Sequence, residues 1–264
     1  MKRIVCGLMM CFFIAGLATA HAGGNAKKPS PAEALDILKQ GNERFYRGES
    51  LHPHIDIKRI KQTGTESQAD HAYATIVGCS DSRVPPELIF DAGLMDLFVI
   101  RVAGNVCDTD EIGSVEYGVA HVRTPVLVIL GHGQCGAVTA VTHAITGKGH
   151  ALEANIPPLV DNIEPAVKRA LKQAHWETHG DAVVPLAIEQ NVYQSIEDLF
   201  MHSAATRDLV KKGAVMVVGA IYDVNTGRVK WLPEKNVTDI LTRVEKNKTR
   251  AMNPMAEPAG DVHH

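Results

Sequence analysis

Residues 125–146, PVLVILGHGQCGAVTAVTHAIT, change character twice along their length. The apolar run up to Leu130 is typical of a buried strand, and the last part is typical of a helix. Between them lie closely spaced glycines together with His132 and Cys135. A strand that turns directly into a helix is the repeating unit of a parallel sheet, so this stretch predicts an α/β fold.

Other apolar runs extend the same pattern on both sides. YATIVG (73–78) and DLFVIRVAG (96–104) also resemble buried parallel strands, and helical segments separate them from residues 125–132. Residues 214–232, AVMVVGAIYDVNTGRVKWL, predict a strand, a turn through Asn225-Thr226-Gly227 and an antiparallel partner. We therefore expect a mostly parallel β-sheet, flanked by helices, with an antiparallel edge strand.

Helix signals are clear at several places. Ser30, Pro31 and Glu33 form a capping box with proline at the first helical position, and Gly48 can end that helix. Two later stretches carry apolar residues at helical spacing. They are Leu159, Ile163, Val167 and Leu171, and Ile188, Val192, Ile196 and Leu199.

The first 22 residues differ from the rest of the chain. MKR is a positively charged start, IVCGLMMCFFIAGLA is an apolar run, and ATAHA offers small residues for cleavage after Ala20 or Ala22. This is the pattern of a secretory signal peptide, and an uncleaved N-terminal anchor is the alternative. We predict a signal peptide at 1–22, a catalytic domain at 23–244 and a disordered tail at 245–264. The protein would be periplasmic or secreted, with no stable membrane insertion after cleavage.

Net charge and cysteine count exclude two classes of protein. The net charge of −3 carries no basic surplus, so nucleic-acid binding is not expected. Of the five cysteines, Cys79, Cys107 and Cys135 lie outside the predicted signal peptide. An odd number of cysteines in an exported chain is not a disulfide scaffold, which suggests another use for some of these thiols.

Metal-binding residue types stand at the ends of two predicted strands. Cys79 ends the strand in ATIVGC (74–79), while His132 and Cys135 follow the strand in PVLVILG (125–131). Since parallel strands bring their carboxyl ends to one edge, these side chains are expected to lie together there. Thiolate and imidazole are ligands that zinc prefers, and Cys135 is expected in the first turn of a helix starting near Gly133.

Less specific interpretations exist for each residue. A lone histidine near a turn is usually a satisfied structural side chain, and a lone buried cysteine is usually inert. A purely structural zinc would normally have four protein ligands, whereas three are convincing here because Cys107 stands several residues beyond its strand. An open fourth position favours a catalytic metal.

Asp81 and Arg83 follow the first ligand at two and four residues. They can reach the open side of the metal, where a carboxylate can accept a hydrogen bond from water or occupy the fourth position itself. Arginine can hold that carboxylate by a forked pair. The alternative is a turn-capping aspartate beside a surface arginine.

CSDSRV (79–84), RVAGN (101–105) and GHGQCGAV (131–138), in this order, resemble the β-class carbonic anhydrases. The resemblance extends from GNERF (41–45) to VVGAIYDVNTGRV (217–229). It implies Zn²⁺ held by Cys79, His132 and Cys135, a catalytic pair of Asp81 and Arg83, and a homodimer or tetramer. It also suggests substrate contacts at Gly136 and at Gln68, which stands further upstream than the family's glutamine.

The implied reaction is the reversible hydration of carbon dioxide to bicarbonate and a proton, with zinc lowering the pKa of its water. Hydrolysis of carbonyl sulfide or carbon disulfide on the same scaffold is one alternative, because it needs the same nucleophile. A non-catalytic zinc-binding protein is another, and the Asp81–Arg83 pair argues against it.

Overall fold

A five-stranded sheet forms the centre of the computed structural model, which describes residues 28–151, 153–174 and 180–256. The strand order is β2-β1-β3-β4-β5, with the first four strands parallel and β5 antiparallel to β4. The strands are β1 (Ala74–Cys79), β2 (Leu97–Val102), β3 (Val126–His132), β4 (Met216–Tyr222) and β5 (Val229–Trp231). The predicted fold class is confirmed, including the antiparallel edge strand.

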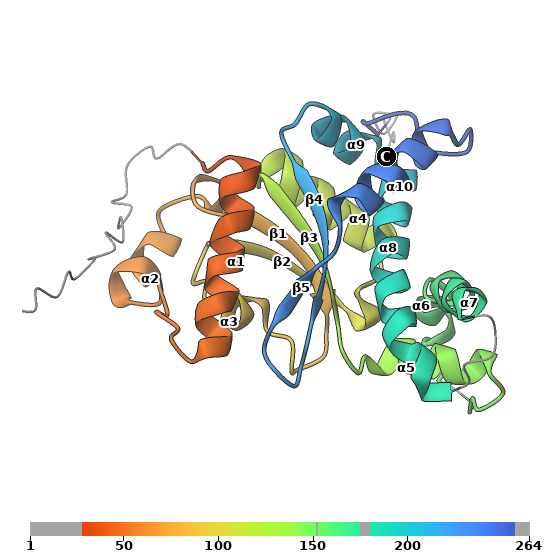
Figure 1. Ribbon diagram of the computed structural model, residues 1–264. Coiled ribbons are helices and arrows are strands. Elements are labelled where there is room, and N and C mark those ends of the chain that lie inside the picture. The colour runs from red at the N-terminus through yellow and green to blue at the C-terminus, as the bar shows by residue number, and fades with distance from the viewer. Residues whose placement is uncertain (1–27, 152, 175–179, 257–264) are drawn as a thin grey trace, which may run out of the picture.

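Helices cover both faces of this sheet (Figure 1). The α-helices are α1 (Pro31–Arg47), α2 (Ile57–Thr63), α3 (Pro86–Ile89), α4 (Thr109–Glu116), α5 (Gly136–Ile145), α6 (Pro157–Asp161), α7 (Glu164–Gln173), α8 (Val184–His202), α9 (Ala204–Lys211) and α10 (Glu234–Lys246). Short helical turns are η1 (Gln68–Asp70), η2 (Ala103–Asn105), η3 (Tyr117–His121) and η4 (Gly180–Val183).

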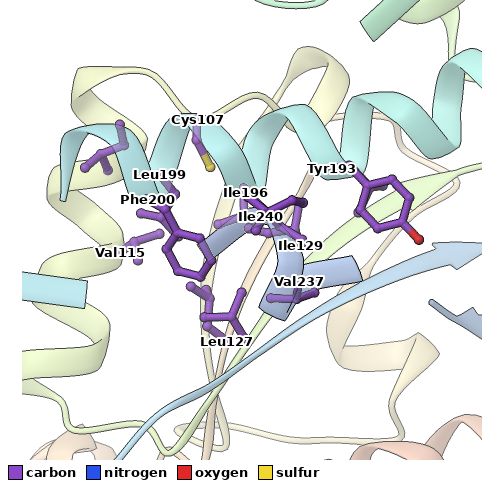
Figure 2. Close-up of a cluster of buried hydrophobic side chains, with 14 of the residues drawn as sticks. Cys107, Val115, Leu127, Ile129, Tyr193, Ile196, Leu199, Phe200, Val237 and Ile240 are labelled. Carbon is purple, nitrogen blue, oxygen red and sulfur yellow. The ribbon is translucent and has the colours of Figure 1, made fainter. Parts of the chain in front are cut away.

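Alternate residues of the strands pack in opposite directions, which explains why the central strands β1 and β3 are mostly apolar. Ile76, Val128 and Leu130 lie in a cluster with Leu38 of α1. Leu127 and Ile129 lie in a second cluster, which α4, α8 and α10 complete on the other face (Figure 2). The central strands β1 and β3 are thus buried on both sides, and their ends remain available for a site.

The local signals in the sequence produce the expected elements. Ser30 and Glu33 make both hydrogen bonds of the capping box, and Gly48 ends α1 in the left-handed conformation at φ 72°. The hairpin between β4 and β5 turns where expected, with Gly227 at φ 75° and a hydrogen bond from the Asp223 amide to the Arg228 carbonyl of 2.8 Å.

Two expectations need correction. The amphipathic stretch from Leu159 to Leu171 is broken between α6 and α7, where Pro165 cannot continue a preceding helix because it lacks an N–H. The predicted tail is also wrong at its start. Helix α10 continues to Lys246, and the Ala251 amide donates to the Met201 carbonyl at 2.8 Å, so residues 245–251 are part of the fold.

The predicted signal peptide at 1–22 and residues 257–264 of the predicted tail lie outside the described residues. In the described part of the chain, no helix has the length and apolar character needed to cross a membrane.

Candidate metal centre

The carboxyl edge of the sheet brings Cys79, His132 and Cys135 together. Cys79 is the last residue of β1, His132 is the last residue of β3, and Cys135 lies at the N-cap of α5. Parallel pairing of β1 with β3 places both strand ends at this edge. The two sulfurs and one nitrogen lie within 4.8 Å of one another, and the three residues are at most 5% exposed. Helix α5 begins at Gly136, so Cys135 caps this helix and does not lie in its first turn as expected.

The two ring nitrogens of His132 have different environments. Nδ1 donates to the Gly133 carbonyl oxygen at 2.9 Å, which leaves Nε2 as the nitrogen with a free lone pair. Nε2 is buried and has no hydrogen-bond partner among the described residues. A buried acceptor without a partner is costly, and a metal ion beside two thiols would satisfy it. The residues therefore fit a metal ion.

The thiols of Cys79 and Cys135 share one negative charge. A hydrogen bond from Cys135 is the main cause that lowers the pKa of Cys79 to about 4, and the neighbouring His132 and the Gly104 amide at 3.3 Å lower it further. The thiolate of Cys79 and burial in turn raise the pKa of Cys135. Together with the unprotonated Nε2 of His132, this set of donors is ready for a divalent metal after Cys135 loses its proton.

Asp81 and Arg83 form the forked pair that the sequence predicts. Arg83 donates from Nε to Asp81 Oδ1 at 3.0 Å and from Nη2 to Oδ2 at 2.7 Å. Asp81 Oδ2 lies 4.0 Å from His132 Nε2, so the carboxylate faces the metal-binding side chains. The hydrogen bonds from Arg83 hold the pKa of Asp81 well below its usual range, and the carboxylate stays ionised.

Two residues that sequence reasoning missed hold this pair in place. Arg101, on β2, donates to the carbonyl oxygens of Cys79 at 3.0 Å and Asp81 at 2.7 Å. Gln134, at φ 57°, accepts from Arg83 with its backbone carbonyl at 3.2 Å and with Oε1 at 3.4 Å. Arg101 belongs to RVAGN and Gln134 to GHGQCGAV, so their motifs were visible, although their contacts depend on the folded loops.

Cys107 lies away from the metal-binding side chains. It is 3% exposed and belongs to the cluster around Leu199 and Phe200 (Figure 2). This cluster lies on the face of the sheet opposite to α1. Burial raises the pKa of its thiol, as expected for an inert core cysteine.

The structure separates the two predicted substrate-contact residues. Gly136 follows Cys135 directly and opens α5 beside the cluster. Gln68 lies in η1, before the first residue of β1, whereas Cys79 is the last residue of that strand. A strand of this length spans roughly 17–20 Å, so Gln68 is remote from the Cys79 of its own chain.

Comparison with known proteins agrees with this arrangement. The sequence model of the carbonic anhydrase family matches residues 74–229. The chain is 35% identical over 201 residues to a carbonic anhydrase of Mycolicibacterium smegmatis, covering 76% of this chain and 93% of that protein. It is 34% identical over 199 residues to carbonic anhydrase 2 of Mycobacterium tuberculosis, covering 75% and 91%.

Solved structures share the fold. The β-carbonic anhydrase CafA of Aspergillus fumigatus superposes with a TM-score of 0.59 at 25% identity, covering 81% of this chain and 97% of that chain. A tetrameric β-carbonic anhydrase of Sordaria macrospora superposes with a TM-score of 0.56 at 22% identity, covering 76% and 96%.

The parallel sheet and the Cys-His-Cys cluster at its carboxyl edge define an α/β enzyme with a metal-binding site. With the family match and the relatives above, the chain belongs to the carbonic anhydrase family, in its β class. Its reaction is the hydration of carbon dioxide to bicarbonate and a proton.

Proposed function

We propose that this carbonic anhydrase uses Zn²⁺, bound by Cys79 Sγ, His132 Nε2 and Cys135 Sγ. The observation that supports this most strongly is the buried, unpartnered Nε2 of His132 beside two thiols. Thiolate and imidazole form a common zinc ligand set, and three protein ligands leave one position open. A bound zinc ion would lower the pKa of water at that position toward neutrality.

Asp81 is proposed to orient the attacking water by accepting a hydrogen bond at Oδ2. This oxygen lies 4.0 Å from His132 Nε2, on the side where the fourth position would be. Because its pKa is held low, Asp81 would remain an acceptor across the working pH range of the enzyme. Arg83 fixes the direction of the carboxylate through the forked pair, and Gln134 holds Arg83 from the other side.

The substrate would approach through a small, mainly apolar space. Val102 and Ala137 pack against the cluster that contains Cys79 and Cys135. Carbon dioxide is small and uncharged, and an apolar wall suits it better than a charged clamp. We propose Gly136 as a backbone contact to substrate, since it lies beside Cys135 and a side chain built there would meet nothing within 4 Å.

We further propose a homodimer or tetramer. Strand β2 lies at one end of the sheet and has a neighbour on one side only, and the Sordaria macrospora relative is tetrameric. An unpaired strand edge is a site where a second chain can add.

The N-terminal signal pattern supports export, to the periplasm or beyond. We expect the protein in the exported fraction with residues 1–20 or 1–22 removed. Cell fractionation and the intact mass of the purified protein test this, and a full-length mass in the cytoplasmic fraction would contradict it.

Metal dependence is tested by assaying carbon dioxide hydration before and after treatment with a chelator, and after adding back Zn²⁺. Activity should disappear and return. Cys135→Ser should lose both metal and activity, whereas the matched variant Cys107→Ala should keep both, because Cys107 lies in the core. Full zinc content in Cys135→Ser would refute the ligand assignment.

A further inference from the structure

The turn η2 follows β2 and contains the last three residues of RVAGN. Gly104 and Asn105 both adopt positive φ angles, 78° and 47°. In this conformation the Gly104 amide donates to Cys79 Sγ at 3.3 Å. The proposed function gives this turn no role, although the turn touches a proposed metal ligand directly.

Helix α8 holds the turn from the far side. Asn191 Nδ2 donates to the Gly104 carbonyl oxygen at 2.7 Å, and Ser195 Oγ donates to the Asn105 carbonyl oxygen at 2.9 Å. Asn191 and Ser195 are one helical turn apart, and each is 1% exposed. Two successive carbonyls of the turn are therefore fixed by two buried side chains of one helix.

Packing leaves the turn little room to move. A side chain built on Gly104 would come within 2.7 Å of Ile163 Cδ1 and 3.3 Å of Ala137 Cβ. The positive φ of Gly104 also disfavours any residue with a side chain. The orientation of the Gly104 amide is thus set from both sides, by α8 on its carbonyl and by apolar contacts over its Cα.

Two of the buried polar side chains between α8 and η2 are incompletely hydrogen-bonded. Asn105 Nδ2 and Asn191 Oδ1 are buried and have no hydrogen-bond partner among the described residues. Each such atom has lost its hydrogen bonds to water without replacement, which destabilises the fold, and apolar residues of similar shape would pack without that cost. An arrangement that tolerates this cost points to a role beyond packing.

We propose that Asn191 and Ser195 are positioning residues for the metal centre. They fix η2 so that the Gly104 amide donates to the Cys79 sulfur, which limits how much electron density the thiolate gives to the metal. The inference rests on the proposed metal site. It adds that two side chains of α8 adjust the donor strength of the Cys79 sulfur. Outer partners of metal ligands commonly have such effects on metal affinity and activity.

The test compares Asn191→Ala with the parent protein after Co²⁺ loading of the full chain. Without the amide of Asn191 the turn relaxes and the hydrogen bond to sulfur weakens, so the sulfur-to-cobalt charge-transfer band should move to longer wavelength. Affinity for Zn²⁺, measured by competition with a chelator, should fall by about 10- to 100-fold, because Cys79 is no longer held in place and its sulfur binds a competing proton more tightly.

Thr124→Val is the matched control. Thr124 is a fully buried polar residue whose hydroxyl bonds with Thr75 at 2.6 Å. It precedes the first residue of β3, whereas His132 is the last, so it lies at the other end of the sheet. This variant should lose stability and keep the parent's cobalt spectrum and zinc affinity.

Ser195→Ala provides a second, milder variant and should shift the band in the same direction by less. It decides the matter if Asn191→Ala does not fold. Spectra and zinc affinities equal to those of Thr124→Val in the variants that fold would overturn the positioning role alone. A parent protein that shows no sulfur-to-cobalt band would overturn the proposed metal site as well.

Discussion

At the scale of single residues, the metal centre depends on where protons reside. His132 donates a hydrogen bond from Nδ1 to the Gly133 carbonyl, so the lone pair is on Nε2. The pKa of Cys79 is lowered to about 4 and that of Cys135 is raised, because the two thiols share one charge. Of the two thiols, therefore, Cys135 alone still carries a proton at neutral pH that a metal must displace.

This distribution predicts the proton release on metal binding. Zn²⁺ binding to the metal-free protein at about pH 7 should release about one thiol proton, from Cys135. Below about pH 4 Cys79 also becomes protonated, so binding should weaken more steeply there. Titration calorimetry in buffers of different ionisation enthalpy measures the number. Release of two thiol protons at about pH 7 would mean that Cys79 is not held as a thiolate.

The hydrogen-bonded pair of Asp81 and Arg83 leads to a second prediction. Asp81→Asn keeps the shape of the side chain but removes its charge, and should lower the hydration rate by about 100-fold or more while zinc content stays unchanged. Arg83→Lys should also lower the rate, because lysine cannot make the two parallel bonds to Asp81.

A matched arginine serves as the control for this experiment. Arg243 pairs with Glu197 at 3.0 Å between α10 and α8, away from the metal-binding residues. Arg243→Lys should retain the parental rate. A parental rate in Asp81→Asn would exclude the carboxylate from the mechanism.

At the scale of elements, α8 serves the core and the site together. Val192, Ile196 and Leu199 pack in the cluster with Leu127 and Ile129 of β3. Gly131 provides the space for this contact, since a side chain there would come within 2.7 Å of Val192 Cγ2. Asn191 and Ser195, on the same helix, reach the turn beside Cys79. Docking α8 on the sheet therefore also sets the surroundings of the metal centre.

Helix α8 also carries a carboxyl group that opposes folding at neutral pH. Burial raises the pKa of Asp198 to about 6, from a usual value near 3.8. The folded state thus binds the proton more tightly than the unfolded state does. The stability contributed by this group is complete below about pH 4 and is lost as the pH rises toward 6.

Asp198→Asn should therefore stabilise the protein above pH 6, by about 1–2 kcal/mol, and have little effect near pH 4. The amide oxygen can still accept the hydrogen bond from Gln194. Thermal or urea unfolding at both pH values measures the difference. Asp239→Asn, at an exposed position on α10, is the control, and an equal response of both variants would contradict the role of burial.

At the scale of the whole molecule, an apolar surface remains exposed beside α1 and α2. Leu51, Ile55, Ile57 and Ile60 are 49–68% exposed and follow one another within ten residues. Exposed apolar residues gathered in this way commonly mark an interface between proteins.

We expect this surface to contribute to self-association. The double variant Ile57→Glu/Ile60→Glu should form a smaller assembly than the parent, with a lower mass in light scattering. Met252→Glu changes an equally exposed apolar residue near the other end of the described chain and should behave as the parent. An unchanged mass for the double variant would place the interface elsewhere.

The sheet, its antiparallel edge and the meeting of Cys79, His132 and Cys135 could all be predicted from the amino-acid sequence. These features follow from signals contained within short stretches: strand periodicity, the Ser30–Glu33 capping box and the glycine turn of the hairpin. Parallel strands must end at one edge, so residues at strand ends could be brought together without knowing how the helices dock.

The side chains that support these ligands from distant parts of the sequence could be identified only in the packed fold. Arg101, Gln134 and Asn191 act across turns whose backbone depends on helix docking, and nothing near them in sequence indicates their partners. Gln68 depends on the fold in the same way. It stands only a few residues before β1, and this places it at the end of the strand opposite to Cys79. Contacts between segments far apart depend on the packed whole, because burial and hydrogen-bond satisfaction are settled only there.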